Sequence, residues 1–197
     1  MIHTIYEYLL LRDLTTVPAE ICFMLTIDDL GSAPDRIYDI VTWSLEVSGI
    51  RMVTFHIDTE DPALCEPYIE EIRKVSGIAH LHLHQGEEYF EAGKGLSVMV
   101  VIGKSGRWEV TESIRRIAEE GVDPCDITEE MIEEHLTFRC APDLIIKTGG
   151  SHLTDFLIWQ SVYSELFFLD MNWEFFRKTD FLRALRDYQS RTRRFGA

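Results

Sequence analysis

Long apolar runs and a surplus of positive charge are both missing from this chain of 197 residues. A helix that crosses a membrane needs about 20 consecutive apolar residues, and Asp155, Glu165 and Asp170 interrupt the most hydrophobic stretch. Lys and Arg number 19 against 34 Asp and Glu, which gives a formal net charge of −15 at pH 7. We therefore expect no nucleic-acid partner, at most peripheral membrane contact, and only local phosphate sites.

Cysteine is also scarce, and its four copies form no Cys-x-x-Cys pair. No signal peptide precedes them, and they are scattered along the chain, at Cys22, Cys65, Cys125 and Cys140. This pattern favours a reducing compartment over a disulfide framework. We expect a cytoplasmic protein in which the four cysteines are small core side chains.

Apolar residues make up 46% of the chain, which at this length is enough for one substantial core. We therefore expect a single domain over residues 1–197, opened by an amphipathic helix within residues 1–18. Apolar runs or period-two alternation predict strands at 21–27, 51–58, 78–84, 96–102 and 143–147. Helical spacing predicts helices at 32–49, 61–77, 110–121, 126–136, 154–166 and 179–194.

Capping signals support two of these helices: Ser32 is the expected N-cap of the first, and Asp126 with Glu129 forms an expected capping box. The alternation of strands and helices indicates an α/β fold with a mostly parallel central sheet surrounded by helices. Ligands of such sheets bind beyond the carboxyl ends of the strands.

The acidic chain ends on a basic segment, "SRTRRFGA" (190–197), which carries Arg191, Arg193 and Arg194. Two interpretations of this segment are open. It is either a solvated helix end, favoured there by the helix dipole, or a group that holds an anion.

Four longer stretches resemble signature sequences of one family: "GRWEV" (106–110), "PDLIIKTGG" (142–150), "DFLIWQSVYSELFF" (155–168) and "FLRALRDYQSRTRRFG" (181–196). They resemble the cis-prenyltransferases, the undecaprenyl and dehydrodolichyl diphosphate synthases. The resemblance implies a dimeric fold with a parallel sheet surrounded by helices. It also implies the condensation of isopentenyl diphosphate with an allylic diphosphate. That reaction needs Mg²⁺ and arginines for the leaving diphosphate, and a tunnel for the growing chain.

The resemblance fails at the allylic half of the site. Catalytic members follow their first strand with Met-Asp-Gly-Asn-Arg-Arg, whereas Thr26 stands at the position of the metal-binding aspartate here. Asp28 or Asp29 takes that position only with a shifted register. "HIDTEDPAL" (56–64) keeps Thr59 and Glu60 of the next motif but lacks its asparagine, tryptophan and arginine.

The isopentenyl half is partly kept. The resemblance implies substrate binding by Lys147, Thr154 and Arg194, a magnesium or substrate-ordering role for Glu165, and catalysis in trans by Arg194 and Gly196. Lys147 replaces an arginine, and His152 lies nearest to a second lost arginine; a lysine does not reproduce the bidentate grip of an arginine. Each residue has an alternative interpretation. Lys147 is then a solvated lysine at a strand end, and Glu165 is a helix residue at a dimer interface.

Loss of the aspartate motif, lysine before Gly-Gly and a retained Arg-x-Gly are together similar to the non-catalytic Nogo-B receptor type of subunit. The lead helix resembles archaeal members. This implies an activity-required subunit of a heterodimer or heterotetramer, whose catalytic partner holds most of the Mg²⁺ site and receives Arg194 and Gly196 at the isopentenyl diphosphate. A self-sufficient homodimer that uses Asp28 or Asp29, and a non-enzymatic polyprenyl-lipid scaffold, remain as alternatives.

His80, His82 and His84 share one face of their predicted strand. Three side chains about 6–7 Å apart in a line do not converge on one tetrahedral ion, so we expect a polar sheet face or an interface there. Four aromatic residues of the C-terminal third fit a dimer seam or plain core packing equally well: Trp159, Tyr163, Phe167 and Phe168.

Overall fold

A seven-stranded sheet organises the chain in the computed structural model, which describes residues 2–136, 138, 140–150 and 159–191. The strands lie in the order β4-β3-β5-β2-β1-β6-β7, and every neighbouring pair is parallel except β3 and β4. Their bounds are β1 Glu20–Thr26, β2 Met52–Asp58, β3 His80–Gln85, β4 Glu88–Ala92, β5 Ser97–Ile102, β6 Leu144–Thr148 and β7 Glu165–Leu169. The predicted α/β class with a mostly parallel sheet is confirmed.

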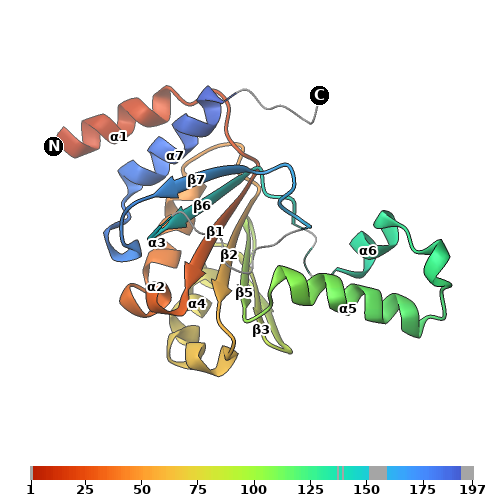
Figure 1. Cartoon of the computed structure of the whole chain (residues 1–197). Helices are drawn as coiled ribbons and strands as arrows, with labels where there is room; N and C mark the ends of the chain where they lie inside the picture. Colours follow the sequence, from red (N-terminus) through yellow and green to blue (C-terminus); the bar gives the residue numbers. More distant parts are fainter. Residues whose placement is uncertain (1, 137, 139, 151–158, 192–197) are drawn as a thin grey trace.

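Helices cover the sheet unevenly, as Figure 1 shows. The α-helices are α1 Ile2–Arg12, α2 Ile27–Ser32, α3 Arg36–Leu45, α4 Ile69–Arg73, α5 Gly106–Glu119, α6 Glu129–His135 and α7 Lys178–Ser190. The 3₁₀ segments are η1 Pro62–Tyr68, η2 Lys74–Gly77, η3 Pro124–Asp126 and η4 Trp173–Phe175. Helix α1 packs on α7, whereas α5 and α6 pair with each other and project from the side of the sheet. None of the described helices is long and apolar enough to cross a membrane.

The main core lies on one face of the sheet, where alternate side chains of the central strands meet α2, α3 and α7. Phe23 of β1 stacks on Phe55 of β2 with ring centroids 5.3 Å apart, and both rings are fully buried. Trp173 and Phe181 close this aromatic cluster from the C-terminal segments. A smaller cluster on the opposite face contains Cys22, Met24, Val101, Phe138, Cys140 and Ile145. Burial on both faces explains the nearly continuous apolar sequence of β1.

Two sequence predictions about strands need correction. The helix predicted over 154–166 is wrong in its described part, because residues 159–163 form turns and Glu165 begins β7, which pairs in parallel with β6. Strand β4 was missed; it forms an antiparallel hairpin with β3 through a turn in which Gly86 has a φ of 55°. A positive φ of this kind is readily adopted by glycine and disfavoured for other residues.

Predictions of helix ends were less accurate. Ser32 is the last residue of α2 rather than an N-cap, since α3 begins after Asp35. Thr128, not Asp126, caps α6 by accepting a hydrogen bond from the backbone N–H of Met131. The helix predicted over 61–77 is split into η1, α4 and η2, with Pro67 inside the first segment. Proline has no backbone N–H to donate, so a continuous α-helix is interrupted there.

The cysteine prediction is confirmed at three positions and wrong at one. Cys22, Cys65 and Cys140 are buried among apolar side chains. Cys125 is exposed in the middle of η3, where the chain turns between α5 and α6.

Candidate functional site

The carboxyl end of β1 is shaped by a reciprocal pair of hydrogen bonds between Thr26 and Asp29. The Thr26 hydroxyl accepts from the Asp29 backbone N–H at 3.1 Å and donates to the Asp29 carboxylate at 2.8 Å. The same carboxylate oxygen accepts from the Thr26 backbone N–H at 2.9 Å. This is a capping box, which satisfies backbone donors that α2 would otherwise leave unpaired. Thr26 and Asp29 are therefore occupied by local structure.

These residues do not fit a magnesium ion. Mg²⁺ requires near-octahedral oxygen ligation, usually by one or two free carboxylates together with substrate phosphates. The Asp29 carboxylate accepts two hydrogen bonds from Thr26, and the Asp28 side chain is exposed to solvent. Within the described part of the chain, the one group of three potential ligand side chains whose atoms converge lies on β3 and β4, not at this edge. Asp58 lies next to Thr26 across the β1–β2 register and completes no such group.

Lys147 is a buried cation near the carboxyl end of β1. It lies on β6 next to Met24 of β1, and only 8% of its surface is exposed. The alternative of a solvated strand-end lysine is therefore not what the structure shows. No described residue forms an ion pair or hydrogen bond with its ammonium group that would account for this burial.

The turn after Lys147 depends on two glycines. Gly149 and Gly150 have φ values of 72° and 128°, which disfavour any side chain. The Gly149 N–H donates to the Met171 carbonyl at 2.8 Å, so it is committed to the fold. The chain therefore turns sharply after β6, and the Gly149 N–H is not free to bind a phosphate.

Glu165 lies at the amino end of β7 and Thr26 at the carboxyl end of β1, so the two residues are at opposite ends of the parallel strands. Glu165 aligns with Leu144, whereas Lys147 aligns with Phe168, three residues further along. Three residues along a strand span roughly 10 Å. Within one chain, the structure therefore does not bring Glu165 and Lys147 together.

The Glu165 carboxylate instead forms an ion pair with Arg191. The Arg191 guanidinium donates to Glu165 at 3.0 Å, to the Leu166 carbonyl at 3.0 Å and to Asp187 at 2.6 Å. These contacts join the end of α7 to the start of β7. They fix the position of Arg191, the last residue that the structure describes.

Several predicted site residues lie outside the described part of the chain. His152 and Thr154 belong to residues 151–158, and Arg193, Arg194 and Gly196 to residues 192–197. Their roles remain predictions.

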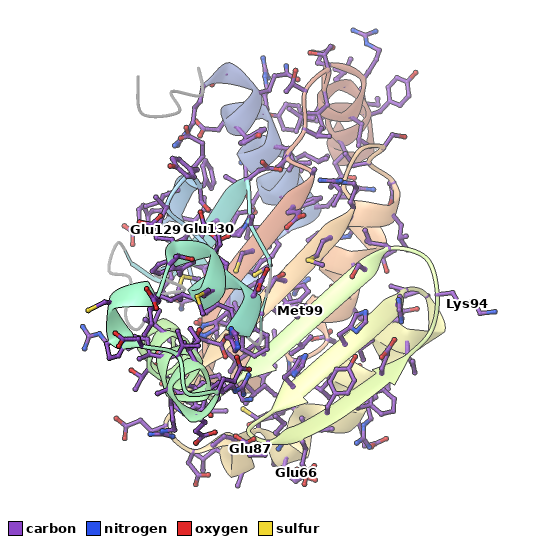
Figure 2. All side chains as sticks on the ribbon, turned by 90° about the vertical axis from the view of Figure 1, so that its right-hand side faces the viewer. Glu66, Glu87, Lys94, Met99, Glu129 and Glu130 are labelled. Atoms are coloured by element: carbon purple, nitrogen blue, oxygen red, sulfur yellow. The ribbon has the colours of Figure 1, made fainter. Side chains whose placement is uncertain are left out.

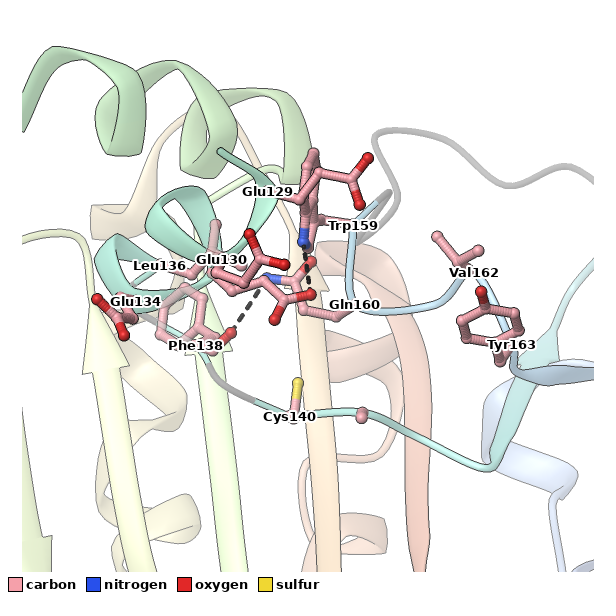
Figure 3. Close-up of a pocket in the computed structure, with 12 residues that line it drawn as sticks. Glu129, Glu130, Glu134, Leu136, Phe138, Cys140, Trp159, Gln160, Val162 and Tyr163 are labelled. Carbon is pink, nitrogen blue, oxygen red and sulfur yellow. Dashed lines mark hydrogen bonds between the residues drawn. The ribbon is translucent and has the colours of Figure 1, made fainter. Parts of the chain in front are cut away.

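A cleft of about 850 Å³ lies between α6 and two later parts of the chain, from which Phe138, Cys140, Trp159 and Tyr163 line it. Four carboxylates of α6 line it, from Glu129, Glu130, Glu133 and Glu134. Trp159 donates to Glu133 at 3.3 Å and Gln160 to the Phe138 carbonyl at 3.1 Å, as Figure 3 shows. So many like charges oppose the binding of a diphosphate in this cleft.

The aromatic residues of the predicted seam do not form plain core. Tyr163 and Phe168 are exposed, and Trp159 and Phe167 are partly buried. Val162, beside Tyr163, exposes 67% of its surface. Because β7 is an edge strand, this group forms an apolar border of the sheet.

Comparisons with known proteins agree on one family. A family profile described as "Putative undecaprenyl diphosphate synthase" matches residues 68–196. A protein of Methanocaldococcus jannaschii named "tritrans,polycis-undecaprenyl-diphosphate synthase (geranylgeranyl-diphosphate specific)" is 46% identical over 108 residues, which is 50% of this chain and 39% of that protein. An isoprenyl transferase of Thermus thermophilus is 29% identical over 252 positions, covering 99% of this chain and 95% of the relative.

The second alignment is longer than this chain of 197 residues, so the Thermus protein has residues without a counterpart here. A crystal structure of a probable undecaprenyl diphosphate synthase from Campylobacter jejuni superimposes with a TM-score of 0.70 at 15% identity. It covers 93% of this chain and all of that chain. At such low identity the similarity establishes the fold.

Proposed function

The chain belongs to the undecaprenyl diphosphate synthase family of cis-prenyltransferases, and from that premise we propose that it is a non-catalytic, activity-required subunit of a heteromeric enzyme. The complex condenses isopentenyl diphosphate with an allylic diphosphate to make a long-chain polyprenyl diphosphate. The partner, a catalytic subunit with the aspartate motif, holds Mg²⁺ and the tunnel for the growing chain. This chain donates Arg194 and Gly196 to the partner's active site. We place the complex in the cytoplasm, with peripheral membrane contact because its product is apolar.

The capping box at the end of β1 carries this proposal. At the position where the family resemblance calls for a metal-binding aspartate, Thr26 caps α2, and Asp29 is held by two hydrogen bonds from Thr26. Moving Asp29 toward a metal costs both of these bonds and leaves the Thr26 N–H without its acceptor. The local structure therefore opposes a shifted-register aspartate.

Charge and length support the same interpretation. Lys147 is a single buried cation where the family uses arginine, and a lysine provides a point charge rather than a two-pronged grip on a diphosphate. The cleft under α6 is lined by four glutamates. The relative from Thermus thermophilus has additional residues that this shorter chain lacks.

The retained end of the chain supports donation in trans. Arg191 is fixed by Glu165, the Leu166 carbonyl and Asp187, so the six residues that follow start from a defined point. A fixed starting point lowers the entropy that the tail loses when it binds. Arg194 combines a bidentate phosphate donor with the close backbone approach that Gly196 permits.

Isopentenyl diphosphate incorporation tests the proposal. The purified chain alone should be inactive, and co-purification with a family member that has the full aspartate motif should give an active complex. Arg194→Ala should reduce the activity of that complex at least tenfold while leaving the complex intact, because a charge-assisted phosphate contact is lost. Arg193→Ala is the matched control and should change the rate less than twofold.

Two results would contradict this function. Activity of the chain alone at the rate of its partner complex, abolished by Asp28→Ala with Asp29→Ala, would establish a self-sufficient homodimer. A complex whose activity ignores Arg194→Ala would establish a scaffold.

A further inference from the structure

The β3–β4 hairpin carries a polar cluster that the proposed function does not use. His80 and His82 lie on the same face of β3, and their ring centroids are 4.3 Å apart. Glu91 of β4 lies directly opposite His82 in the antiparallel register. One potential ligand atom from each of these three side chains lies within 4.8 Å of the others. The prediction that His80, His82 and His84 do not converge holds, but Glu91 takes the third place from the neighbouring strand.

We propose that His80, His82 and Glu91 bind a divalent transition-metal ion, with zinc as the best fit. Imidazole nitrogen and carboxylate oxygen are ordinary zinc ligands, with bonds of about 2.0–2.2 Å. A tetrahedral ion holds such ligands roughly 3.4 Å apart, so a bound ion would replace the hydrogen bond of 2.9 Å that now joins Nε2 of His80 to the Glu91 carboxylate. The fourth position faces solvent, since the His80 side chain is 35% exposed.

Magnesium is the wrong ion for this cluster. It prefers six oxygen ligands, and only Glu91 provides oxygen here. The proposed site is therefore chemically distinct from the Mg²⁺ of prenyl transfer, and its test is independent of the proposed function.

The Tyr89 hydroxyl forms hydrogen bonds with two of the three proposed ligands, His82 and Glu91. The hydroxyl oxygen lies 2.7 Å from the Glu91 carboxylate and 2.8 Å from Nδ1 of His82. A carboxylate only accepts, so the Tyr89 hydroxyl donates to Glu91 and accepts from the Nδ1–H of His82. Nε2 of His82 is then the unprotonated nitrogen with a free lone pair. Hydrogen bonds of this kind, which fix the tautomer of a ligand, are typical of metal sites.

The strands beneath the cluster are rigid. Leu81 and Leu83 alternate with the histidines and are buried in the main core, which fixes the face of β3 that carries the ligands. Gly93, just after β4, has a φ of 92°, and a Cβ there would lie 1.9 Å from the Ala79 carbonyl oxygen. The close approach of Gly93 to Ala79 locks the open end of the hairpin. Figure 2 looks onto this face, and no described helix crosses in front of β3 and β4.

Zinc titration of the full chain tests the proposal. Cys125→Ser serves as the parent because this cysteine is exposed and would bind zinc by itself. Calorimetry should show one zinc ion per chain with a micromolar or lower Kd, and cobalt should give the visible absorption of a tetrahedral site. His82→Gln and Glu91→Gln should each weaken binding at least tenfold.

Two further variants complete the design. His135→Gln is the matched control, because His135 lies on α6, bonded to Glu120 and Met131, and its loss should leave the zinc Kd unchanged. Tyr89→Phe should weaken binding by less than the ligand variants. Circular dichroism checks that each variant is folded, and excess Mg²⁺ should not displace zinc. Absence of saturable binding below 100-fold excess zinc, or equal Kd values in the parent, His82→Gln and Glu91→Gln, would overturn the proposal.

Discussion

Asp29 has a structural duty that its neighbour Asp28 does not share. It accepts two hydrogen bonds from Thr26 and closes the capping box of α2, whereas Asp28 is exposed. Asp29→Ala should therefore destabilise the chain by about 1 kcal/mol, the usual cost of losing a helix cap. Urea unfolding measures this difference.

The control for that experiment is Asp28→Ala, which should change the unfolding free energy by no more than about 0.5 kcal/mol. Equal effects of the two substitutions on stability, with both abolishing prenyl transfer, would mean that the pair binds a metal. The proposed function instead predicts that a complex with a catalytic partner tolerates both.

Thiol reactivity separates Cys125 from the other three cysteines. Burial, followed by the charge of Glu20, raises the pKa of Cys140 to about 12, and burial, followed by Asp61, raises that of Cys65 to about 11. Burial likewise raises the pKa of Cys22. At pH 8, Ellman's reagent should modify one thiol of the native chain and all four after unfolding. Rapid modification of a second thiol in the native chain would contradict this burial.

The same pKa shifts have a consequence for stability. A thiol whose pKa is higher in the folded chain than in the unfolded chain favours folding below the unfolded pKa. That contribution is lost as the pH rises from about 9 toward 12. The unfolding free energy should therefore fall above pH 9, measured against Cys65→Ala, in which part of the decline is absent.

At the scale of elements, Glu165 at the start of β7 has two possible roles, as an anchor for Arg191 or as a magnesium ligand. As an anchor for Arg191 it forms a partly exposed ion pair, in which the two side chains are 27% and 34% exposed. A double-mutant cycle with Glu165→Gln and Arg191→Gln should give a coupling energy of about 0.5–1 kcal/mol. Chemical denaturation measures the four corners of this cycle.

Magnesium dependence completes that test. If Glu165 positions Arg191, Glu165→Gln should lower the activity of the complex without changing the Mg²⁺ concentration that gives half-maximal rate. Asp187→Asn is a matched control, because it removes the other carboxylate of Arg191 and should act in the same way. An increased Mg²⁺ requirement specific to Glu165→Gln would assign Glu165 to the metal.

Local sequence patterns predicted the elements whose apolar period is clear, and they failed where distant pairing decides. The continuous apolar sequence of β1 and the alternation in β3 give correct strands. Helical spacing predicted a helix over 154–166, but pairing with β6 makes residues 165–169 a strand. Strand β4 is short and two of its five residues are acidic, so Gly86 between two alternating runs was the one local indication of a hairpin.

In the candidate sites too, the sequence indicated single residues but not the contacts between distant ones. Sequence resemblance pointed to Thr26 as a replacement, and the structure added the reason, which is a bond to Asp29 that spans three residues. It pointed to Glu165 but not to Arg191, because their contact joins residues 26 positions apart. Glu91 was missed as a partner of His82 because the hairpin signal at Gly86 was not recognised, and without β4 no residue lies opposite His82.

At the scale of the whole molecule, the sheet ends on β7, and among the described residues Val162, Tyr163 and Phe168 form an exposed apolar border there. An edge strand with unpaired backbone groups and exposed apolar side chains is a ready site for another chain. Val162 exposes 67% of its surface here, and it lies three residues before Glu165, the first residue of β7. The proposed partner subunit should bind at this border.

Val162→Asp tests the location of that interface. Burying a carboxylate in an apolar contact is costly, so this variant should lose co-purification with the catalytic partner and, with it, prenyl-transfer activity. Its unfolding free energy should remain within about 0.5 kcal/mol of the parent, since the side chain is already in solvent. Leu64→Asp is the matched control, because Leu64 is 56% exposed on η1, which packs against α2 and α4 rather than β7. If Leu64→Asp prevents assembly and Val162→Asp does not, the partner binds at the other side of the sheet, and the tail that begins at Arg191 must reach its active site from there.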